Sequence, residues 1–227
     1  MKALTQHITE RLQLNKDRVH KIEYEYFPET KQELQKIIND ITYKHKRDKV
    51  IDLNMIDVSE ITDMSELFID NKHNYNISEW NVSNVTDMSE LFFDSNFNND
   101  ISQWDVSQVE DMAGMFYHST FNQDISKWDV SNVVNMANMF RYSEFNNDIS
   151  QWDVSNVGNM GSMFFSSSFN NDISNWNVSN VKTMNYMFAY SSFDQDISNW
   201  KVSNKCGMDD MFKDCPIETK TPSWYKK

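Results

Sequence analysis

The sequence has little glycine, proline or cysteine, and it has no long apolar segment. Of its 227 residues, 4 are glycine, 3 are proline and 2 are cysteine. No run approaches the roughly 20 apolar residues of a membrane-spanning helix, so we expect no membrane span. The opening residues, MKALTQHITE, lack the apolar stretch of a secretory signal peptide. The location expected from the residues alone is therefore cytoplasmic or virion-associated.

The scarcity of these residues also limits the chemistry that the chain can perform. Two cysteines, Cys206 and Cys215, form neither a disulfide framework nor a metal-ligand set, and we expect both thiols to be reduced. No glycine-rich phosphate-binding loop is present. The five histidines show no metal-ligand spacing; they are His7, His20, His45, His73 and His118. We therefore expect no cofactor and no metal site.

The charge is unevenly distributed along the chain. Residues 1–52 contain 11 Lys or Arg and 9 Asp or Glu, whereas residues 53–227 contain 10 and 25, a net charge of −15. Contacts to phosphate groups need a basic surface, so we expect no nucleic-acid partner. Aromatic residues make up 14% of the chain, which is too many for a disordered protein.

The main feature of the sequence is a 24-residue repeat. Three apolar columns carry this period: Trp80, Trp104, Trp128, Trp152, Trp176 and Trp200; Met64, Met88, Met112, Met136, Met160, Met184 and Met208; and Phe68, Phe92, Phe116, Phe140, Phe164, Phe188 and Phe212. A fixed period of this length predicts a solenoid, in which each unit buries its apolar face against its neighbours. Seven units run from Leu53 to about residue 220, and we number them 1 to 7 by their methionine, starting at Met64.

Two periodicities alternate within each unit. In unit 3, Trp104 and Val106 alternate with polar residues, which predicts a short strand near residues 103–107. Apolar residues then recur at helical spacing, which predicts a short helix or 3₁₀ turn near residues 111–116. The polar stretches FNND and SN are typical of corners, where Asn, Asp and Ser bond to turn backbone. The expected fold class is an α/β repeat solenoid.

The segments that flank the repeats have a different composition. In PETKQELQKIINDI, Thr30 is the expected N-cap and Glu33 its capping-box partner, and apolar spacing predicts a helix over residues 31–44. Together with a candidate strand at residues 21–27, this helix forms the expected N-terminal cap, residues 21–52. Residues 1–20 are a leader that is either flexible or docks on a partner. Residues 53–220 form the solenoid, and residues 221–227 form a C-terminal tail.

Repeated aspartates raise two chemical hypotheses. A first column, Asp100, Asp124, Asp148, Asp172 and Asp196, resembles a calcium ladder, but calcium-binding coils need glycine-rich turns. We favour backbone capping at each corner. A second column, Asp105, Asp129 and Asp153, could suggest a glycoside hydrolase. Catalysis needs one site with unequal carboxyl environments, so these identical positions favour a solvated acidic strand face and no enzyme.

Two columns vary between units, which is typical of solenoid binding surfaces. These are the two positions that follow the core Phe, and their aromatic members are the candidate anchors: Phe93, Tyr117, Tyr142, Phe165 and Tyr190. Aromatic side chains dominate binding hot spots. The alternative is that these rings pack on neighbouring units or on the caps. A second candidate surface lies on the expected strand face at Gln103, Lys127 and Gln151.

The repeat itself resembles a known family. FNQDISKWDVSNVVNMANMF, residues 121–140, and its five neighbours are similar to BspA-like leucine-rich-repeat surface proteins, in the branch described as "Mycoplasma protein of unknown function". The resemblance covers about three quarters of the chain. It implies a leucine-rich-repeat-like, right-handed solenoid of bacterial or phage-borne origin, linked to adhesion or partner binding, without catalytic residues. By itself it implies a cell-surface location, although family members there carry export signals.

Two hypotheses for function follow. The favoured one is a non-enzymatic, monomeric binding or adhesion module that recognises a protein or a glycan through the variable columns. The alternative is a structural or virion-associated element that residues 1–20 anchor to a larger assembly.

Overall fold

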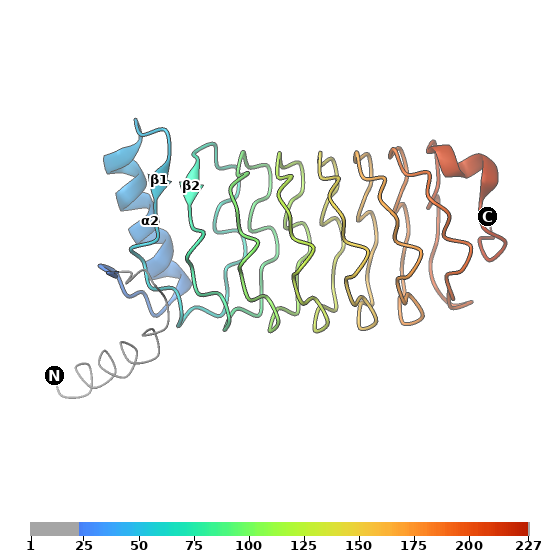
Figure 1. Cartoon of the computed structure of the whole chain (residues 1–227), viewed down its shortest axis with the longest axis horizontal. Helices are drawn as coiled ribbons and strands as arrows, with labels where there is room; N and C mark the ends of the chain where they lie inside the picture. The colour runs from blue at the N-terminus through green and yellow to red at the C-terminus, as the bar shows by residue number, and fades with distance from the viewer. Residues whose placement is uncertain (1–22, 227) are drawn as a thin grey trace.

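The computed structural model describes residues 23–226, and in it successive units lie side by side along the long axis of the molecule (Figure 1). The regular elements are α2 (Lys31–His45), β1 (Ile51–Asp52), β2 (Tyr75–Asn76) and the 3₁₀ helix η1 (Pro216–Lys220). α2 lies at the N-terminal end of the row of units and η1 at the C-terminal end. The units between them contain very little helix or strand.

Neighbouring units are joined by main-chain hydrogen bonds in the register of the repeat, so that equivalent residues lie opposite each other. β1 and β2 pair in parallel, and isolated parallel bridges continue the pairing from Asp63 opposite Asp87 to Thr183 opposite Gly207. We call residues 111–118 of unit 3, and the equivalent residues of the other units, the ladder segment. In each of units 1 to 6, alternate N–H groups of this segment donate to carbonyl oxygens of the next unit.

The helix or 3₁₀ turn predicted near residues 111–116 is wrong, because this segment consists of consecutive tight turns. Met115 N–H donates to Met112 O at 3.3 Å, and the third residue of that turn, Gly114, has a φ of 60°. A positive φ at the third position is typical of a type II turn and interrupts a helix. Two such residues occur in every unit, and 13 of them are not glycine. The turns direct alternate N–H groups toward the next unit.

The strand predicted near residues 103–107 is also wrong, although its in-and-out pattern is present. The segment forms turns: Trp104 N–H donates to Ile101 O at 3.1 Å, and Ser107 N–H donates to Asp105 Oδ1 at 3.1 Å. Alternate residues are still buried and exposed. A chain of short turns can therefore produce the alternation that usually marks a strand.

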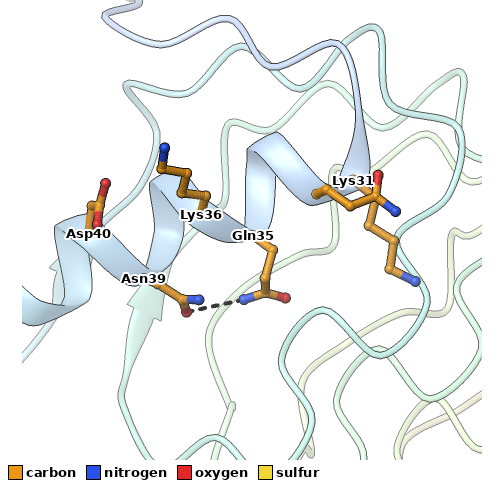
Figure 2. A pocket seen from close by; sticks show the side chains of 6 residues that line it. Lys31, Gln35, Lys36, Asn39 and Asp40 are labelled. Atoms are coloured by element: carbon orange, nitrogen blue, oxygen red, sulfur yellow. Dashed lines mark hydrogen bonds between the residues drawn. The ribbon is translucent and has the colours of Figure 1, made fainter.

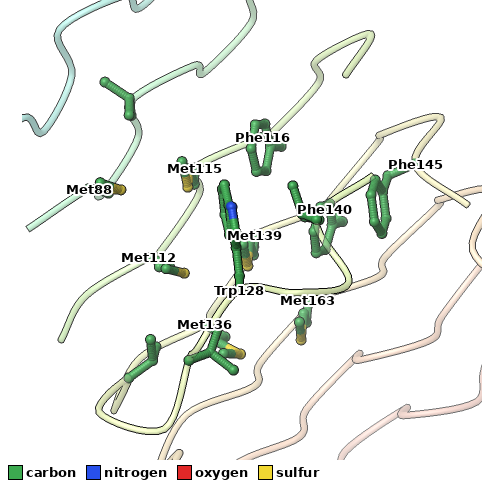
Figure 3. Packing of buried hydrophobic residues seen from close by; sticks show 14 of the residues in the cluster. Met88, Met112, Met115, Phe116, Trp128, Met136, Met139, Phe140, Phe145 and Met163 are labelled. Atoms are coloured by element: carbon green, nitrogen blue, oxygen red, sulfur yellow. The ribbon is translucent and has the colours of Figure 1, made fainter. Parts of the chain in front are cut away.

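The core consists of the apolar columns, whose inward position is confirmed. Trp128 is 4% exposed, and its indole N–H donates to Ile101 O of the preceding unit at 3.2 Å. Figure 3 shows this ring among Phe116 and the core methionines. The rings of Phe116 and Phe140 stack with centroids 5.6 Å apart. The core Phe rings from Phe68 to Phe212 thus contact their equivalents in neighbouring units.

The N-terminal helix predicted over residues 31–44 is confirmed as α2. Thr30 Oγ1 accepts the N–H of Glu33 at 3.2 Å, as an N-cap does, while Glu33 Oε2 accepts the N–H of Glu29 at 2.9 Å. Its buried residues face the repeats; they are Leu34, Ile38 and Ile41. Of the candidate strand at residues 21–27, the described part forms a single bridge, from Tyr26 to Ile56. The expected leader, residues 1–20, lies outside the described residues.

The tryptophan column extends into the tail, beyond the solenoid predicted at residues 53–220. Trp224, in the tail at residues 221–227, lies one repeat period after Trp200 and stacks on it with centroids 6.1 Å apart. Its indole N–H donates to Ile197 O at 3.1 Å, as in the full units. The described part of the tail therefore covers the last unit with a side chain of the repeat pattern.

Candidate functional site

The constant polar columns form hydrogen bonds with turn backbone. The first aspartate column caps its corners as predicted, since each Oδ1 accepts a serine N–H two residues later at 2.8 to 2.9 Å: Asp100, Asp124, Asp148, Asp172 and Asp196. The backbone N–H of Ser126 lowers the pKa of Asp124. These carboxylates therefore serve as acceptors within the fold.

The second aspartate column has the same role, contrary to the expected strand face. Asp105, Asp129 and Asp153 are exposed, and each accepts a serine N–H at 3.0 to 3.1 Å. The hydrogen bonds from Ser155 lower the pKa of Asp153. Among residues 23–226, no group of three or more His, Cys, Asp or Glu side chains is placed to hold a metal ion.

Five of the predicted anchors form one continuous row of rings across units 2 to 6, which we call the aromatic strip. Phe93 and Tyr117 stack with centroids 4.3 Å apart. Tyr142 packs edge-on against both Tyr117, at 5.7 Å, and Phe165, at 5.4 Å. Tyr190 continues the row at 5.3 Å from Phe165. The register of the repeat thus joins side chains that are far apart in sequence.

The strip is partly buried and partly open to solvent. Tyr142 is 40% exposed and Tyr190 is 45% exposed, whereas Phe93, Tyr117 and Phe165 are half-buried. The rings therefore do pack on neighbouring units, as the alternative hypothesis held. The rings also expose part of their surface to solvent, mainly at Tyr142 and Tyr190.

The ladder segment determines how the two exposed tyrosines are held. Both have a positive φ, 57° at Tyr142 and 60° at Tyr190, a conformation that bulky residues rarely adopt. Their N–H groups are tied to the next unit: Tyr142 donates to Phe165 O at 2.9 Å and Tyr190 to Lys213 O at 2.7 Å. The main-chain ladder, and not the ring, thus fixes their backbone.

A cation lies in the middle of the strip. The Arg141 guanidinium is 4.1 Å from the ring centroid of Phe165 and 5.0 Å from that of Tyr142, distances at which a cation is attracted to an aromatic face. Its Nη2 donates to Tyr142 OH at 3.3 Å. Within residues 23–226, no carboxylate pairs with Arg141, and its buried Nε has no hydrogen-bond partner.

The charges at the two ends of the strip are paired. At the N-terminal end, Asp94 contacts His118 Nδ1 at 2.7 Å and Lys72 Nζ at 3.3 Å, and the hydrogen bond from His118 is the main cause of its lowered pKa. At the other end, a hydrogen bond with Tyr190 is the main cause of the raised pKa of Lys213, which also lies 4.0 Å from Asp210. Arg141 differs from both of these lysines, since no carboxylate pairs with it among the described residues.

The second candidate surface is less organised. Gln103, Lys127 and Gln151 are exposed, and the two glutamines bond only to the serine beside them, Gln103 to Ser102 Oγ and Gln151 to Ser150 Oγ, each at 3.2 Å. No contact in the described structure joins the three side chains. They lie on turns and not on a strand, so the scaffold does not assemble them into a site.

Two other features carry no recognisable chemistry. A shallow pocket runs along α2 (Figure 2) and is lined by Lys31, Gln32, Gln35, Lys36, Asn39 and Asp40. Both cysteines are free and buried, and burial raises the pKa of Cys206 and raises that of Cys215 to about 11. Since a nucleophilic cysteine needs a lowered pKa, neither thiol resembles one.

The regular register between units and the repeated columns define a tandem-repeat protein. Its family is the one described as "Mycoplasma protein of unknown function, DUF285", whose model matches residues 33–142 and 119–224, and the chain belongs to that family. Searches of curated proteins and of solved structures found no match. In the part of the chain that the structure describes, no helix has the length and apolar character needed to cross a membrane.

Proposed function

We propose that this protein is a non-enzymatic binding module that recognises a macromolecular partner, a protein or a glycan, through the aromatic strip. The observation that carries the proposal is the strip itself, in which consecutive ring centroids are no more than 5.7 Å apart across five units. Tyr and Arg are among the residues most enriched in binding hot spots. A row of such side chains on a rigid support is pre-organised, so little conformational entropy is lost on binding.

The proposal includes the scaffold. We infer a leucine-rich-repeat-like, right-handed solenoid of the BspA-like kind, in which the ladder segments form one continuous surface. The parallel register, which matches the period of the sequence, and the apolar columns support this inference. On such a scaffold, a side chain can change in one unit without altering the main-chain bonds to the next.

The carboxylates support a non-catalytic role. A general acid needs a carboxyl group whose pKa is raised toward the working pH. Here the resolved shifts run the other way: hydrogen bonds hold the pKa values of Asp124, Asp153 and Asp172 below their usual range. These groups are suited to capping turns and not to donating protons.

The test uses a double variant, Tyr142→Ser with Tyr190→Ser, and a display library of random peptides together with a glycan array as probes. Serine already occupies the same column at Ser166, with a φ of 51°, so the backbone should tolerate both changes. The matched control is Tyr43→Ser, which removes a 74% exposed tyrosine from α2.

We expect ligands selected on the wild-type protein to bind the double variant about 30-fold more weakly, which corresponds to about 2 kcal/mol. The control should bind within twofold of wild type. Surface changes usually cost within about 0.5 kcal/mol each, so urea melts should show a folded double variant. The proposal would be overturned if the ligands bound the wild type, the double variant and the control equally. It would also be overturned if binding were lost only when residues 1–20 were removed.

A further inference from the structure

We infer that the partner of the aromatic strip is a protein segment that presents a carboxylate to Arg141, flanked by apolar side chains that cover Tyr142 and Phe165. This inference rests on the proposed function and adds the class of partner. It starts from the charge at the centre of the strip.

Arg141 has unused capacity for hydrogen bonds. A guanidinium group carries five N–H donors in a fixed fork, and among the described residues this one makes a single hydrogen bond, to Tyr142 OH. Its Nε is buried without a partner, so a ligand would bind through the terminal Nη groups. By contrast, the lysines near the strip have an acidic neighbour: Lys72 contacts Asp94, and Lys213 lies near Asp210. Arg141 is thus available to a ligand.

A carboxylate is the complementary group. Arginine binds carboxylates through two parallel hydrogen bonds, and these charge-assisted bonds are stronger than neutral ones. The rings of Phe165 and Tyr142 lie 4.1 and 5.0 Å from the guanidinium, so a ligand seated on them would exclude water from the pair. Lower local polarity strengthens the attraction between opposite charges. The favoured ligand therefore combines one acidic group with apolar surface.

The composition of the strip favours a protein over a glycan. The centres of protein–protein interfaces are enriched in Tyr, Phe and Arg and depleted of Lys, Glu and Asp. The strip consists of Phe93, Tyr117, Tyr142, Phe165 and Tyr190, and Arg141 lies in its middle. Its ring centroids follow a path of about 20 Å, which an extended peptide of about six residues would cover at about 3.3 Å per residue.

The experiment uses a display library of random 12-residue peptides, selected on the full-length chain. We expect the selected peptides to contain Asp or Glu next to apolar residues. Replacing that acid by its amide should raise the Kd at least tenfold. Arg141→Gln should cause a similar loss with the unchanged peptide, and Arg141→Lys should retain part of the affinity because lysine lacks the fork. Lys182→Gln, which removes an exposed cation outside both candidate surfaces, is the matched control and should bind as wild type.

The decisive measurement combines the two changes. If the carboxylate faces Arg141, the amide peptide should bind wild type and Arg141→Gln with similar Kd, so that the two losses do not add. The peptide change tests the pair even if Arg141→Gln proves unstable. The inference would be overturned if the selected peptides contained no Asp or Glu, or if the losses of affinity from the two changes added. It would also be overturned if the library yielded no binding peptide. Binding of a glycan on the array through the strip would also overturn the inference that the partner is a protein. In that case, if the Tyr142 and Tyr190 double variant no longer bound the glycan, the proposed function would still hold.

Discussion

Replacing one tryptophan of the core column should destabilise the protein far more than replacing its exposed neighbour. Trp128 is 4% exposed, and truncating a buried tryptophan to alanine typically costs about 3–5 kcal/mol. The variant also loses the indole hydrogen bond to Ile101 O. Ile101 O still accepts the N–H of Trp104 at 3.1 Å and is therefore not left without a partner, so the lost indole bond adds only about 1 kcal/mol. The expected total for Trp128→Ala is about 5 kcal/mol.

Urea melts followed by the fluorescence of the remaining tryptophans measure this effect. With an m-value of about 2 kcal/mol/M, the midpoint of Trp128→Ala should fall by about 2.5 M. Trp128→Phe keeps an aromatic ring in the column, and its midpoint should fall by less than about 1 M, which keeps the test informative if the alanine variant is unfolded throughout. Lys127→Ala removes an exposed side chain and should stay within about 0.5 kcal/mol of wild type. Equal midpoints for Trp128→Ala and Lys127→Ala would refute the inward tryptophan column.

Two further predictions concern the turns. Gly114→Ala should destabilise the protein by about 1 kcal/mol in urea melts, because φ at this position is +60° and the new Cβ would lie 3.1 Å from Glu90 Cγ. Ser162 lies in the same column with a φ of 54°, so Ser162→Gly should leave the stability unchanged or raise it. Because hydrogen bonds lower the folded-state pKa of carboxyls such as Asp124 and Asp172, their stabilisation is present above the unfolded value of about 3.9 and is lost as pH falls below it. The melting temperature should therefore decline between about pH 4 and pH 2, and a constant value across that range would contradict the capping role.

The period of the sequence predicted which residues meet, but it did not predict the backbone conformation between them. Any stack in the register of the repeat brings each core residue next to its equivalents in the neighbouring units, so the core columns followed from spacing alone. The row of rings did not, because Tyr117 and Phe165 lie in one column and Tyr142 lies in the next. Helical spacing and two-residue alternation, in contrast, are also produced by consecutive tight turns. The property that distinguishes these turns from a helix or a strand is the positive φ at two positions in each unit. Asp94 and Asn138 are residue types that tolerate it, and this signal was present in the sequence.

The surroundings of Arg141 could not be predicted from the sequence. It occupies the same column as Tyr117 and Phe165, and the repeat pattern does not show which carboxylates come within reach of it. The proposal for Arg141 depends on three-dimensional facts: the rings beneath it, and the lack of an acidic partner for it among the described residues. Trp224 is a different case, since its spacing of one repeat period from Trp200 was available in the sequence.

The variable side chains lie on the ladder segment for a physical reason. Elsewhere in the unit, polar side chains form the bonds that hold the stack together: Asn132 Nδ2 donates to Ser107 O of the preceding unit at 2.6 Å, and Asp124 caps its own corner. Changing such a residue alters the scaffold. The ladder segment is joined to the next unit by main-chain bonds, which remain when its outward side chain is replaced. Side chains such as Tyr142 and Arg141 can therefore be replaced without loss of the main-chain bonds that hold the stack together.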